Sequence, residues 1–450
     1  MRENGFATGI MYILMVFLAV GLAVLIFFNF QANSQQKAEL EAAEALAAAT
    51  ATPEPTGTPE PTATPSRNTE TVTLAFAGDI VGQAGLTTDA ATVTTVGEGD
   101  EAVESTSYDY YDELSGVIPS LSGADFTACT LVGTLSASGA YDEGYGMNSA
   151  MARALSGAGF SLVNLATDHI LEQGLDGLVS TVNVLENEGI QTSGAHKSQE
   201  TKGVYMANVQ GVQVAVLSYT YGTGGVSVVD NPWCVDILTT DYMTDQTTVD
   251  YDAIDSDIQL VKNAGADIVV CFVYWWDNTQ YYPIARDNQT EVVSHLFETG
   301  VDIVIGGGVK TPQPMELRTV ERPDGSKANC VVCYSLSNLM SCFNDKYTNL
   351  SATAKIEISR DTDTGDTWIS GLRYDPLFML DTDDYDGYNE PGYKYRLLDA
   401  YEAVRNYDGG SRSISEATYE AIKTGVEDLH SLMGAEYDSA SGGVTAEYPY

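Results

Sequence analysis

Short apolar runs alternate with amphipathic stretches along most of the chain. Seven runs rich in valine, isoleucine, leucine and aromatic residues predict mostly buried strands, at residues 71–77, 125–129, 160–166, 212–219, 267–274, 301–306 and 330–336. Between several of them, four stretches place apolar side chains at helical spacing and end in glycine, at residues 148–159, 175–189, 251–265 and 288–300. This alternation predicts an α/β domain in layers, with helices packed on a largely parallel core.

The first 69 residues depart from this pattern and predict three further segments. Residues 5–30 carry no charge and exceed the roughly 20 residues that a helix needs to cross a bilayer, so they predict a transmembrane anchor. A cleaved secretory signal is the alternative, but its apolar region usually has only about 7 to 15 residues. Residues 1–4 are then a cytoplasmic N-terminus. Residues 31–69 predict a helical spacer and a Thr/Pro-rich stalk, in which TPEPT occurs twice.

The rest of the chain divides near residue 380. Residues 70–380 hold the α/β pattern, and residues 381–450 predict an acidic C-terminal extension with closing helices over 393–405 and 413–433. The six cysteines lie mostly inside strand patterns, so we expect buried thiols. A bridge from Cys330 or Cys333 to Cys342 is the alternative in an exported protein.

The charge balance narrows the choice of partners. The chain has 21 Lys and Arg against 63 Asp and Glu, a net charge of −42. Such a chain repels phosphate backbones and anionic membrane surfaces, so we expect no nucleic-acid partner. Its partners should be cations or surfaces that carry them.

Polar side chains gather at the downstream ends of the predicted strands, where open α/β sheets bind ligands. Asp79 follows the first strand, and Asp168, His169 and Glu172 follow the third. These oxygen and nitrogen donors suit Mn, Zn or Fe, so all four are candidate metal ligands, with Asp79 and His169 as candidate catalytic residues. The alternatives are a hydrogen-bonded structural histidine and aspartates that cap helices.

Later strand ends supply candidate binding residues, which are Tyr274, Trp275, Trp276, Asp277, Asn278, Lys310 and Asn338. The aromatic members predict either a surface that stacks on sugar rings or packs against a partner, or the core of a loop. The glycine run 306–308 predicts either a tight turn or a backbone nest for an anion.

The order of these blocks resembles the CapA family of capsule and poly-γ-glutamate synthesis proteins. The blocks, which span about residues 70–357, are LAFAGDIVG, LSGADFTACTLVGTLS, LSGAGFSLVNLATDHILEQGLDGLVSTVNVLENEGIQTSGA, GVQVAVLSYTYG, YWWDN, GVDIVIGGG and YSLSNL. The resemblance implies a layered, metallophosphoesterase-like α/β fold with mostly buried strands and flanking helices, preceded by one transmembrane helix. It also implies a single-pass protein of the bacterial cell membrane with its C-terminal domain outside, and an envelope polymer or capsule-synthesis membrane proteins as partners.

Several positions depart from the family pattern. Gly-Asp of the first strand is kept as Gly78-Asp79, and Asn-Asn-His-x-x-Asp has become residues 167–172, which keep the histidine and lengthen the acid. The amide and carboxylate of Asn-Leu-Glu are lost at residues 130–132. His-Trp-Gly-x-Glu has become residues 274–278, and Gly-His-x-x-His has become residues 306–310, so three imidazoles and a second carboxylate are lost.

Lys310 stands where the family pattern has a histidine. Two positive charges about 4 Å apart repel by about 4 kcal/mol at an effective dielectric constant near 20, so Lys310 and a divalent metal should exclude one another. We therefore expect Lys310 to replace the cation and to pair with some of Asp79, Asp168 and Glu172. The alternative is that its ammonium points into solvent.

Two function classes follow. The first is a non-catalytic CapA-like protein of capsule, poly-γ-glutamate or other envelope polymer synthesis, a pseudoenzyme without a cofactor. The second is an active metal-dependent hydrolase or transferase with a reduced site, in which Mn, Zn or Fe binds Asp79, Asp168, His169 and Glu172. The lost histidines favour the first class.

Overall fold

The computed structural model describes residues 67–96, 103–137, 144–276, 279–382 and 394–450. The predicted cytoplasmic N-terminus, the predicted anchor at residues 5–30 and nearly all of the predicted stalk lie outside these residues. Within them, no helix combines the length and apolar character needed to cross a bilayer.

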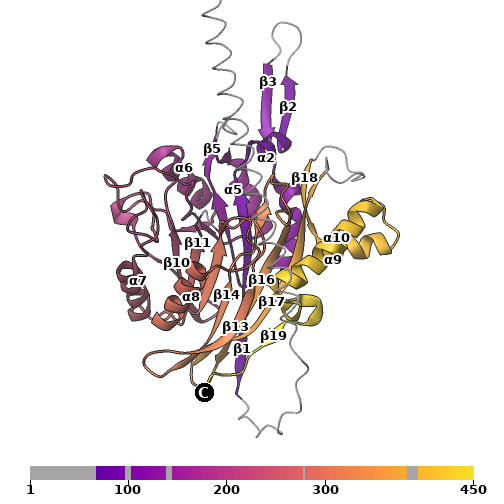
Figure 1. Cartoon of the computed structure of the whole chain (residues 1–450). Coiled ribbons are helices and arrows are strands. Elements are labelled where there is room, and N and C mark those ends of the chain that lie inside the picture. The colour runs from indigo at the N-terminus through magenta and orange to yellow at the C-terminus, as the bar shows by residue number, and fades with distance from the viewer. Residues whose placement is uncertain (1–66, 97–102, 138–143, 277–278, 383–393) are drawn as a thin grey trace, which may run out of the picture. The chain divides into compact units, whose positions relative to one another are not determined.

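Two β-sheets form the centre of the described unit (Figure 1). The larger sheet has the order β18-β17-β16-β1-β4-β7-β8, with β15 paired to β1 and β19 paired to β17. Its strands are β1 (Thr69–Val81), β4 (Phe126–Val132), β7 (Leu162–Asn164), β8 (Gln191–Ser193), β15 (Asn338–Met340), β16 (Leu350–Asp361), β17 (Thr367–Asp381), β18 (Tyr395–Asp399) and β19 (Val444–Thr445). The smaller sheet has the order β13-β14-β12-β11-β10-β9. Its strands are β9 (Tyr205–Val209), β10 (Val212–Thr220), β11 (Ile268–Tyr274), β12 (Ile303–Gly307), β13 (Met315–Glu321) and β14 (Lys327–Cys333).

The two sheets pack face to face because alternate residues of each strand point toward the other sheet. On β1, Leu74 and Phe76 point inward, and the ring of Phe76 lies 6.2 Å from that of Phe126 and 5.9 Å from that of Phe272. Ala75 and Ala77 point to the opposite face, into a second cluster. One strand therefore contributes to two layers of core.

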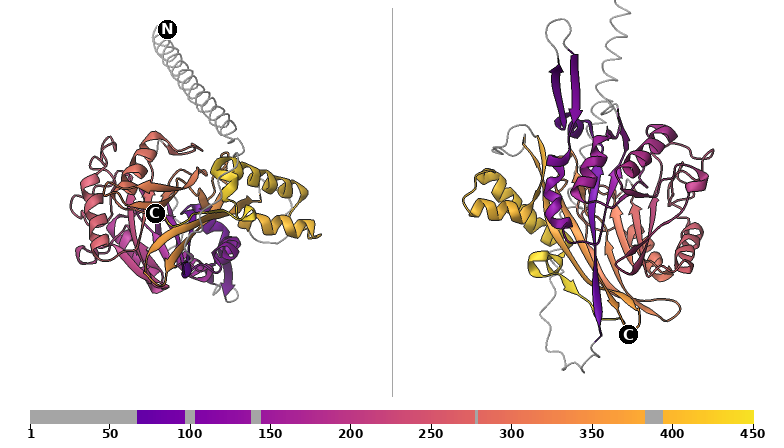
Figure 2. Two further views of the ribbon diagram at one scale, coloured as in Figure 1. Left: turned by 90° about the horizontal axis from the view of Figure 1, so that it is seen from below. Right: turned by 180° about the vertical axis from the view of Figure 1, so that it is seen from behind.

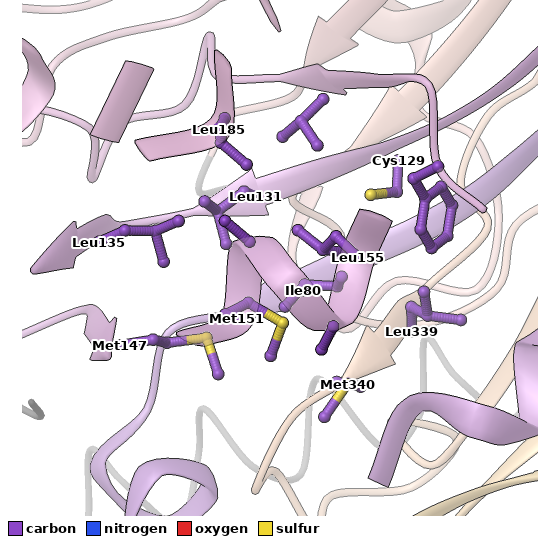
Figure 3. Packing of buried hydrophobic residues seen from close by; sticks show 14 of the residues in the cluster. Ile80, Cys129, Leu131, Leu135, Met147, Met151, Leu155, Leu185, Leu339 and Met340 are labelled. Carbon is purple, nitrogen blue, oxygen red and sulfur yellow. The ribbon is translucent and has the colours of Figure 1, made fainter. Parts of the chain in front are cut away.

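Helices cover the outer faces of both sheets. The larger sheet is covered mainly by α5 (Ala150–Ala158) and α6 (Gly174–Asn187), together with α2 (Ala84–Asp89), α3 (Tyr111–Leu114) and α4 (Ile118–Leu121). Figure 3 shows this layer, where Met151 and Leu155 of α5 pack between Ile80, Leu131 and Met340. The smaller sheet is covered by α7 (Tyr251–Asn263) and α8 (Asp287–Thr299). The α/β class with buried strands and flanking helices is thus confirmed.

All seven predicted strands and all four predicted helices are present, with shifts of a few residues at their ends. The sheets are less parallel than expected. The long strands β16 and β17 pair antiparallel with each other, and β16 pairs antiparallel with β1. Parallel pairing holds between β1, β4, β7 and β8, and between β10, β11, β12 and β14.

The residues after 380 continue the larger sheet. The strand β18 occupies part of the stretch predicted as the first closing helix, and α9 (Ala400–Asp408) follows it. The helix α10 (Glu416–Leu429) confirms the second closing helix, and its Ile422 and Leu429 join the core between the sheets. The six cysteines carry free thiols, and five of them are buried, as expected.

Two short pairings complete the described strands. The hairpin of β2 (Ala91–Val96) and β3 (Val103–Tyr108) projects from the unit, as Figures 1 and 2 show from two sides. The strands β5 (Thr134–Ser136) and β6 (Gly146–Asn148) pair in parallel next to α6.

The first described residue is fixed to the last ones. The Arg67 guanidinium lies 3.9 Å from the centroid of the Tyr448 ring. It also pairs with Asp361 at 3.1 Å and with Asp366 at 3.3 Å. Trp368 lies beside the same ring, with centroids 5.2 Å apart. Both ends of the described unit therefore meet at the upstream end of β1.

Candidate functional site

Asp79 lies at the centre of the site, near the downstream end of β1. The ladder between β1 and β4 shifts register just before it, and its backbone N–H donates to the carbonyl of Ser337 at 2.9 Å. A Cβ atom at Gly78 would lie only 2.2 Å from that carbonyl oxygen, which explains the glycine before Asp79. Asp79 pairs with Asn338 of β15 in the parallel register.

Burial dominates the electrostatics of Asp79, which is 3% exposed. The pKa of its carboxyl is raised to about 7, mainly by burial and in smaller part by the charge of Asp168. The backbone N–H of Gly308, which donates to Oδ2 at 2.7 Å, and the charge of Lys310 lower that pKa. Asp79 therefore changes its charge near neutral pH.

The glycine run 306–308 forms a tight turn around this carboxyl. A Cβ atom at Gly307 would lie 2.6 Å from Oδ1 of Asp79, and Gly308 has a φ of +85°. The run therefore lets the backbone approach the carboxyl closely and point one amide at it. The Gly308 amide that could have bound an outside anion is used by Asp79.

Asp168, His169 and Glu172 form a chain of contacts just after β7. The hydroxyl of Tyr221 donates to Oδ2 of Asp168 at 3.0 Å, and Nε2 of His169 lies 3.4 Å from the same oxygen. Nδ1 of His169 is hydrogen-bonded to Oε1 of Glu172, and the other oxygen of Glu172 accepts the backbone N–H of Tyr145. The Tyr145 ring covers the imidazole, with centroids 3.8 Å apart.

These contacts do not form a metal site. Among the residues that the structure describes, no three His, Cys, Asp or Glu side chains come close enough together to hold an ion. One oxygen of each acid already accepts a hydrogen bond from the protein, because Gly308 donates to Asp79, Tyr221 to Asp168, and Tyr145 to Glu172. The donor set among the described residues therefore does not fit a divalent metal.

The aromatic run at residues 274–276 is core and not a stacking surface. Tyr274, Trp275 and Trp276 are 4%, 0% and 6% exposed. The indole N–H of Trp275 donates to the carbonyl of Tyr334 at 2.8 Å, and that of Trp276 donates to the carbonyl of Gln246. The prediction that these three bind a ligand is corrected, because the end of β11 passes beneath the smaller sheet's helical layer. Asp277 and Asn278 lie outside the described residues.

Tyr274 nevertheless contributes to the electrostatics of the site. Burial raises the pKa of its phenol well above the usual value, and the charges of Asp168 and Asp79 raise it further. Its ring packs on Gly308, where an added Cβ would lie 3.1 Å from Cε1. The phenol therefore stays neutral at neutral pH.

Lys310 lies half-buried at the edge of the site. Nζ donates to Oε1 of Gln280 at 2.8 Å and lies 4.7 Å from the ring centroid of Phe343 and 5.2 Å from that of Tyr281. Its charge lowers the pKa of Asp79. The expected pairing of its ammonium with Asp79, Asp168 or Glu172 stays a prediction. An ammonium against two rings and an amide is partly stripped of water.

Backbone strain is concentrated around this lysine. Of the six described non-glycine residues with positive φ, four are Tyr281, Lys310, Ser337 and Tyr347. The side-chain amide of Asn338 holds this region together by donating to the carbonyl of Lys310 at 3.2 Å. Its Oδ1 is buried and has no hydrogen-bond partner among the described residues. Such strain is typical of functional sites.

The convergence of strand ends was predicted, but several partners were not. Tyr221, Tyr145, Gln280 and Phe343 touch the predicted residues. Of these four, Tyr221 lies in a block that carries the family resemblance, and the others lie outside the blocks. Tyr221 could have been predicted, because it lies just after the predicted strand at residues 212–219 and the other candidates were selected at strand ends. For the other three, the sequence offers no signal.

Comparison with known proteins adds the family. The family model described as "Bacterial capsule synthesis protein PGA_cap" matches residues 73–342. A capsule biosynthesis protein CapA of Bacillus anthracis is 26% identical over 157 residues, which is 34% of this chain and 36% of that protein. The match thus spans little more than a third of that relative's length.

Solved structures with a similar arrangement are distant. One is a phosphatase from Mycoplasma pneumoniae, at 12% identity and a TM-score of 0.39, covering 69% of this chain and 94% of that one. Another is the calcineurin-like phosphoesterase YfkN from Bacillus subtilis, at 10% identity and a TM-score of 0.35, covering 81% and 97%. Because the family match covers more than half of the chain and agrees with the CapA resemblance of the sequence, the chain belongs to the bacterial capsule synthesis protein family PGA_cap.

Proposed function

We propose that this chain is a membrane-anchored, extracellular member of the family that acts in the synthesis of capsule, poly-γ-glutamate or another envelope polymer without hydrolysing a substrate. Its partners on this proposal are the polymer itself or membrane proteins of capsule synthesis. Residues 5–30 would anchor it in the bacterial cell membrane, with the C-terminal domain outside.

One observation carries the non-catalytic part of the proposal. The remaining acids of the site are held by protein donors, namely the Gly308 and Tyr145 amides and the Tyr221 hydroxyl. A metal bound through the same oxygens would compete with these donors and would be repelled by the Lys310 ammonium. A donor that it displaced would become an unsatisfied buried polar group, which costs about 1–3 kcal/mol.

The charge of the chain limits how a polymer could bind. With a net charge of −42, most of the surface repels a polyanion such as poly-γ-glutamate. Lys310 is a basic side chain at the site and gives it a local point of attraction. On this proposal the site recognises one end or one carboxylate of a polymer, while the rest of the strand stays in solvent.

Metal content and turnover of the purified full chain test the proposal. We expect less than one equivalent of Mn, Zn or Fe by elemental analysis. We also expect no metal-dependent turnover of phosphoester, γ-glutamyl or peptidoglycan substrates. The informative variant is His169→Ala, because His169 is the imidazole that the site retains.

The matched control is His295→Ala. Like His169, His295 stacks on a tyrosine, with centroids 4.0 Å from Tyr251, and bonds to a carboxylate, at 2.8 Å from Asp255. Stoichiometric metal together with turnover that is lost in His169→Ala but kept in His295→Ala would establish the hydrolase or transferase instead. Recovery of the full chain from the soluble cytoplasmic fraction would contradict the anchoring.

A further inference from the structure

A cavity of about 370 Å³ lies beside the loop 341–349. Phe343 of this loop lines the cavity and also contacts Lys310 of the site around Asp79. The loop forms one wall, the ends of β16, β17 and β18 form the floor, and α10 forms the opposite wall. Its volume lies within the range of small-molecule pockets, about 300–1,000 Å³. Except for Ser341, every lining residue follows residue 342, where the family match ends.

Acidic and aromatic side chains together line this cavity. Asp345, Asp381 and Asp428 supply three carboxylates, against the Lys346 ammonium in the lining and that of Lys394, 4.0 Å from Asp381. The aromatic members are Phe343, Tyr347, Phe378 and Tyr395. Three carboxylates against two ammonium groups disfavour an anion. Ring faces attract cations, and three of these rings already face a lysine of this chain, Phe343 facing Lys310, Tyr347 facing Lys346 and Tyr395 facing Lys394.

A buried hydroxyl in the wall lacks a partner. Ser341 is 3% exposed and lines the cavity, and its Oγ has no hydrogen-bond partner among the described residues. Buried hydroxyls are normally hydrogen-bonded, so an unsatisfied one calls for an explanation. Rotation about χ1 would present this oxygen to a donor in the cavity.

The shape of α10 keeps the cavity closed at its base. Gly425 lies directly on Leu350 and Phe378, because a Cβ atom there would come within 2.7 Å of a Leu350 methyl carbon. The helix therefore sits close to the strands at Gly425, while Ala421, Thr424 and Asp428 border the open space. Leu350, Phe378 and Gly425 are buried, so the base of the cavity is preformed, whereas residues 344–346 and Thr424 are exposed.

We propose that this cavity binds a small organic cation, an amine carried on an apolar body. The carboxylates would hold the ammonium, Ser341 Oγ would accept one of its hydrogens, and the rings would cover the apolar part. A bare metal ion would leave these apolar walls unused, and an anion would meet three carboxylates against two ammonium groups. This inference goes beyond the proposed function and does not depend on it.

Isothermal titration calorimetry on the full chain tests the cavity with hexylamine and cadaverine as probes. We expect saturable binding of one equivalent of at least one of these amines. Sodium glutamate, inorganic phosphate and calcium chloride are titrated in parallel, because they represent an organic anion, an inorganic anion and a metal ion.

Two variants and one matched control locate the binding. Asp428→Asn removes a carboxylate of the lining and should weaken amine binding by about tenfold, as the loss of a charge-assisted hydrogen bond does. Glu427→Gln removes the same charge one residue earlier on α10, outside the cavity, and should change affinity by less than about twofold. Thr424→Trp fills the mouth from an exposed position and should abolish binding while the thermal midpoint stays unchanged.

Three outcomes would overturn the proposal. The first is no saturable binding of either amine, and the second is equal weakening by Asp428→Asn and Glu427→Gln. The third is binding of glutamate, phosphate or calcium that Thr424→Trp abolishes while amines do not bind. None of them bears on the metal content or turnover measured for the site around Asp79, so the two proposals fail separately.

Discussion

The site around Asp79 and the cavity beside α10 both contain carboxylates and aromatic rings, but the surroundings of these groups differ. At the site, each acid accepts a hydrogen bond from the protein, and a side chain at Gly307 would clash with the Asp79 carboxyl. At the cavity, three carboxylates and an unsatisfied hydroxyl surround about 370 Å³. In the part that the family model matches, the carboxylates of the site are hydrogen-bonded within the protein. The part after residue 342 contributes nearly all of the lining of an open cavity.

The contrast shows two ways in which a folded chain accommodates carboxylates. A buried carboxylate needs either a cation or hydrogen-bond donors. Around Asp79, the protein supplies a backbone amide, a nearby ammonium and a raised pKa. The following changes test how tightly the site is packed and whether its carboxylates need a cation from outside the protein.

The largest effect is expected from Gly306→Ala. The new Cβ would lie 2.0 Å from the Tyr334 carbonyl oxygen and 2.1 Å from Trp275 Nε1, between the two atoms of a buried hydrogen bond. We expect a loss of about 3–5 kcal/mol in the free energy of unfolding, measured by urea denaturation. Gly203→Ala is the control, because nothing lies within 4 Å of its added Cβ. Similar stability of the two variants would show that the site is loosely packed.

The second effect is a change in pH dependence in Asp79→Asn. Because the pKa of Asp79 is raised from 3.8 to about 7, its contribution to stability is fully present below pH 3.8 and is lost as the pH rises through 7. Asparagine has no such loss. The stability of the variant relative to the wild type should therefore increase by about 2–3 kcal/mol between pH 5 and pH 8.

Urea denaturation at both pH values gives this difference directly. Asp230→Asn, at an exposed aspartate, is the control and should keep a constant offset from the wild type. A constant offset for Asp79→Asn as well would mean that the carboxyl is ionised throughout this range. An outside cation would then be needed at the site.

The smallest effect is expected from Lys310→Met. Methionine keeps an apolar stem against Phe343 but removes the charge that lowers the pKa of Asp79. The midpoint of the stability loss should move upward by about half a pH unit, since the lysine is partly exposed and screened. Lys327→Met, whose exposed ammonium bonds to the carbonyl of Tyr450, should leave the midpoint unchanged. A downward shift in Lys310→Met would contradict the assigned role.

Hydrophobic periodicity was sufficient to predict most of the strands and helices of the fold. The buried strands such as β10 and β11 are nearly continuous apolar runs, and α5 to α8 end near glycines. The strands β16 and β17 were missed because charged residues interrupt them. Lys355 on β16 pairs with Asp375 on β17 at 2.8 Å, a contact that a local pattern does not reveal.

The candidate site was predictable in its position but not in its bonding. Strand ends brought Asp79, Asp168 and Lys310 to one region, as expected from parallel pairing. Which donor meets each carboxylate depends on loop conformation, such as the positive φ of Gly308 that aims its amide. The run at 274–276 shows the same limit, because an aromatic sequence fits a buried layer and a binding surface equally well.

The length of β1 separates the two ends of the strand by a fixed distance. Arg67 and Tyr448 lie at one end of the strand, and Asp79 lies ten residues beyond Thr69, about 33 Å away at 3.3 Å per residue. The strand therefore works as a rigid spacer. A label or fusion placed at Tyr450 would lie far from Asp79 and would leave the surroundings of its carboxyl clear.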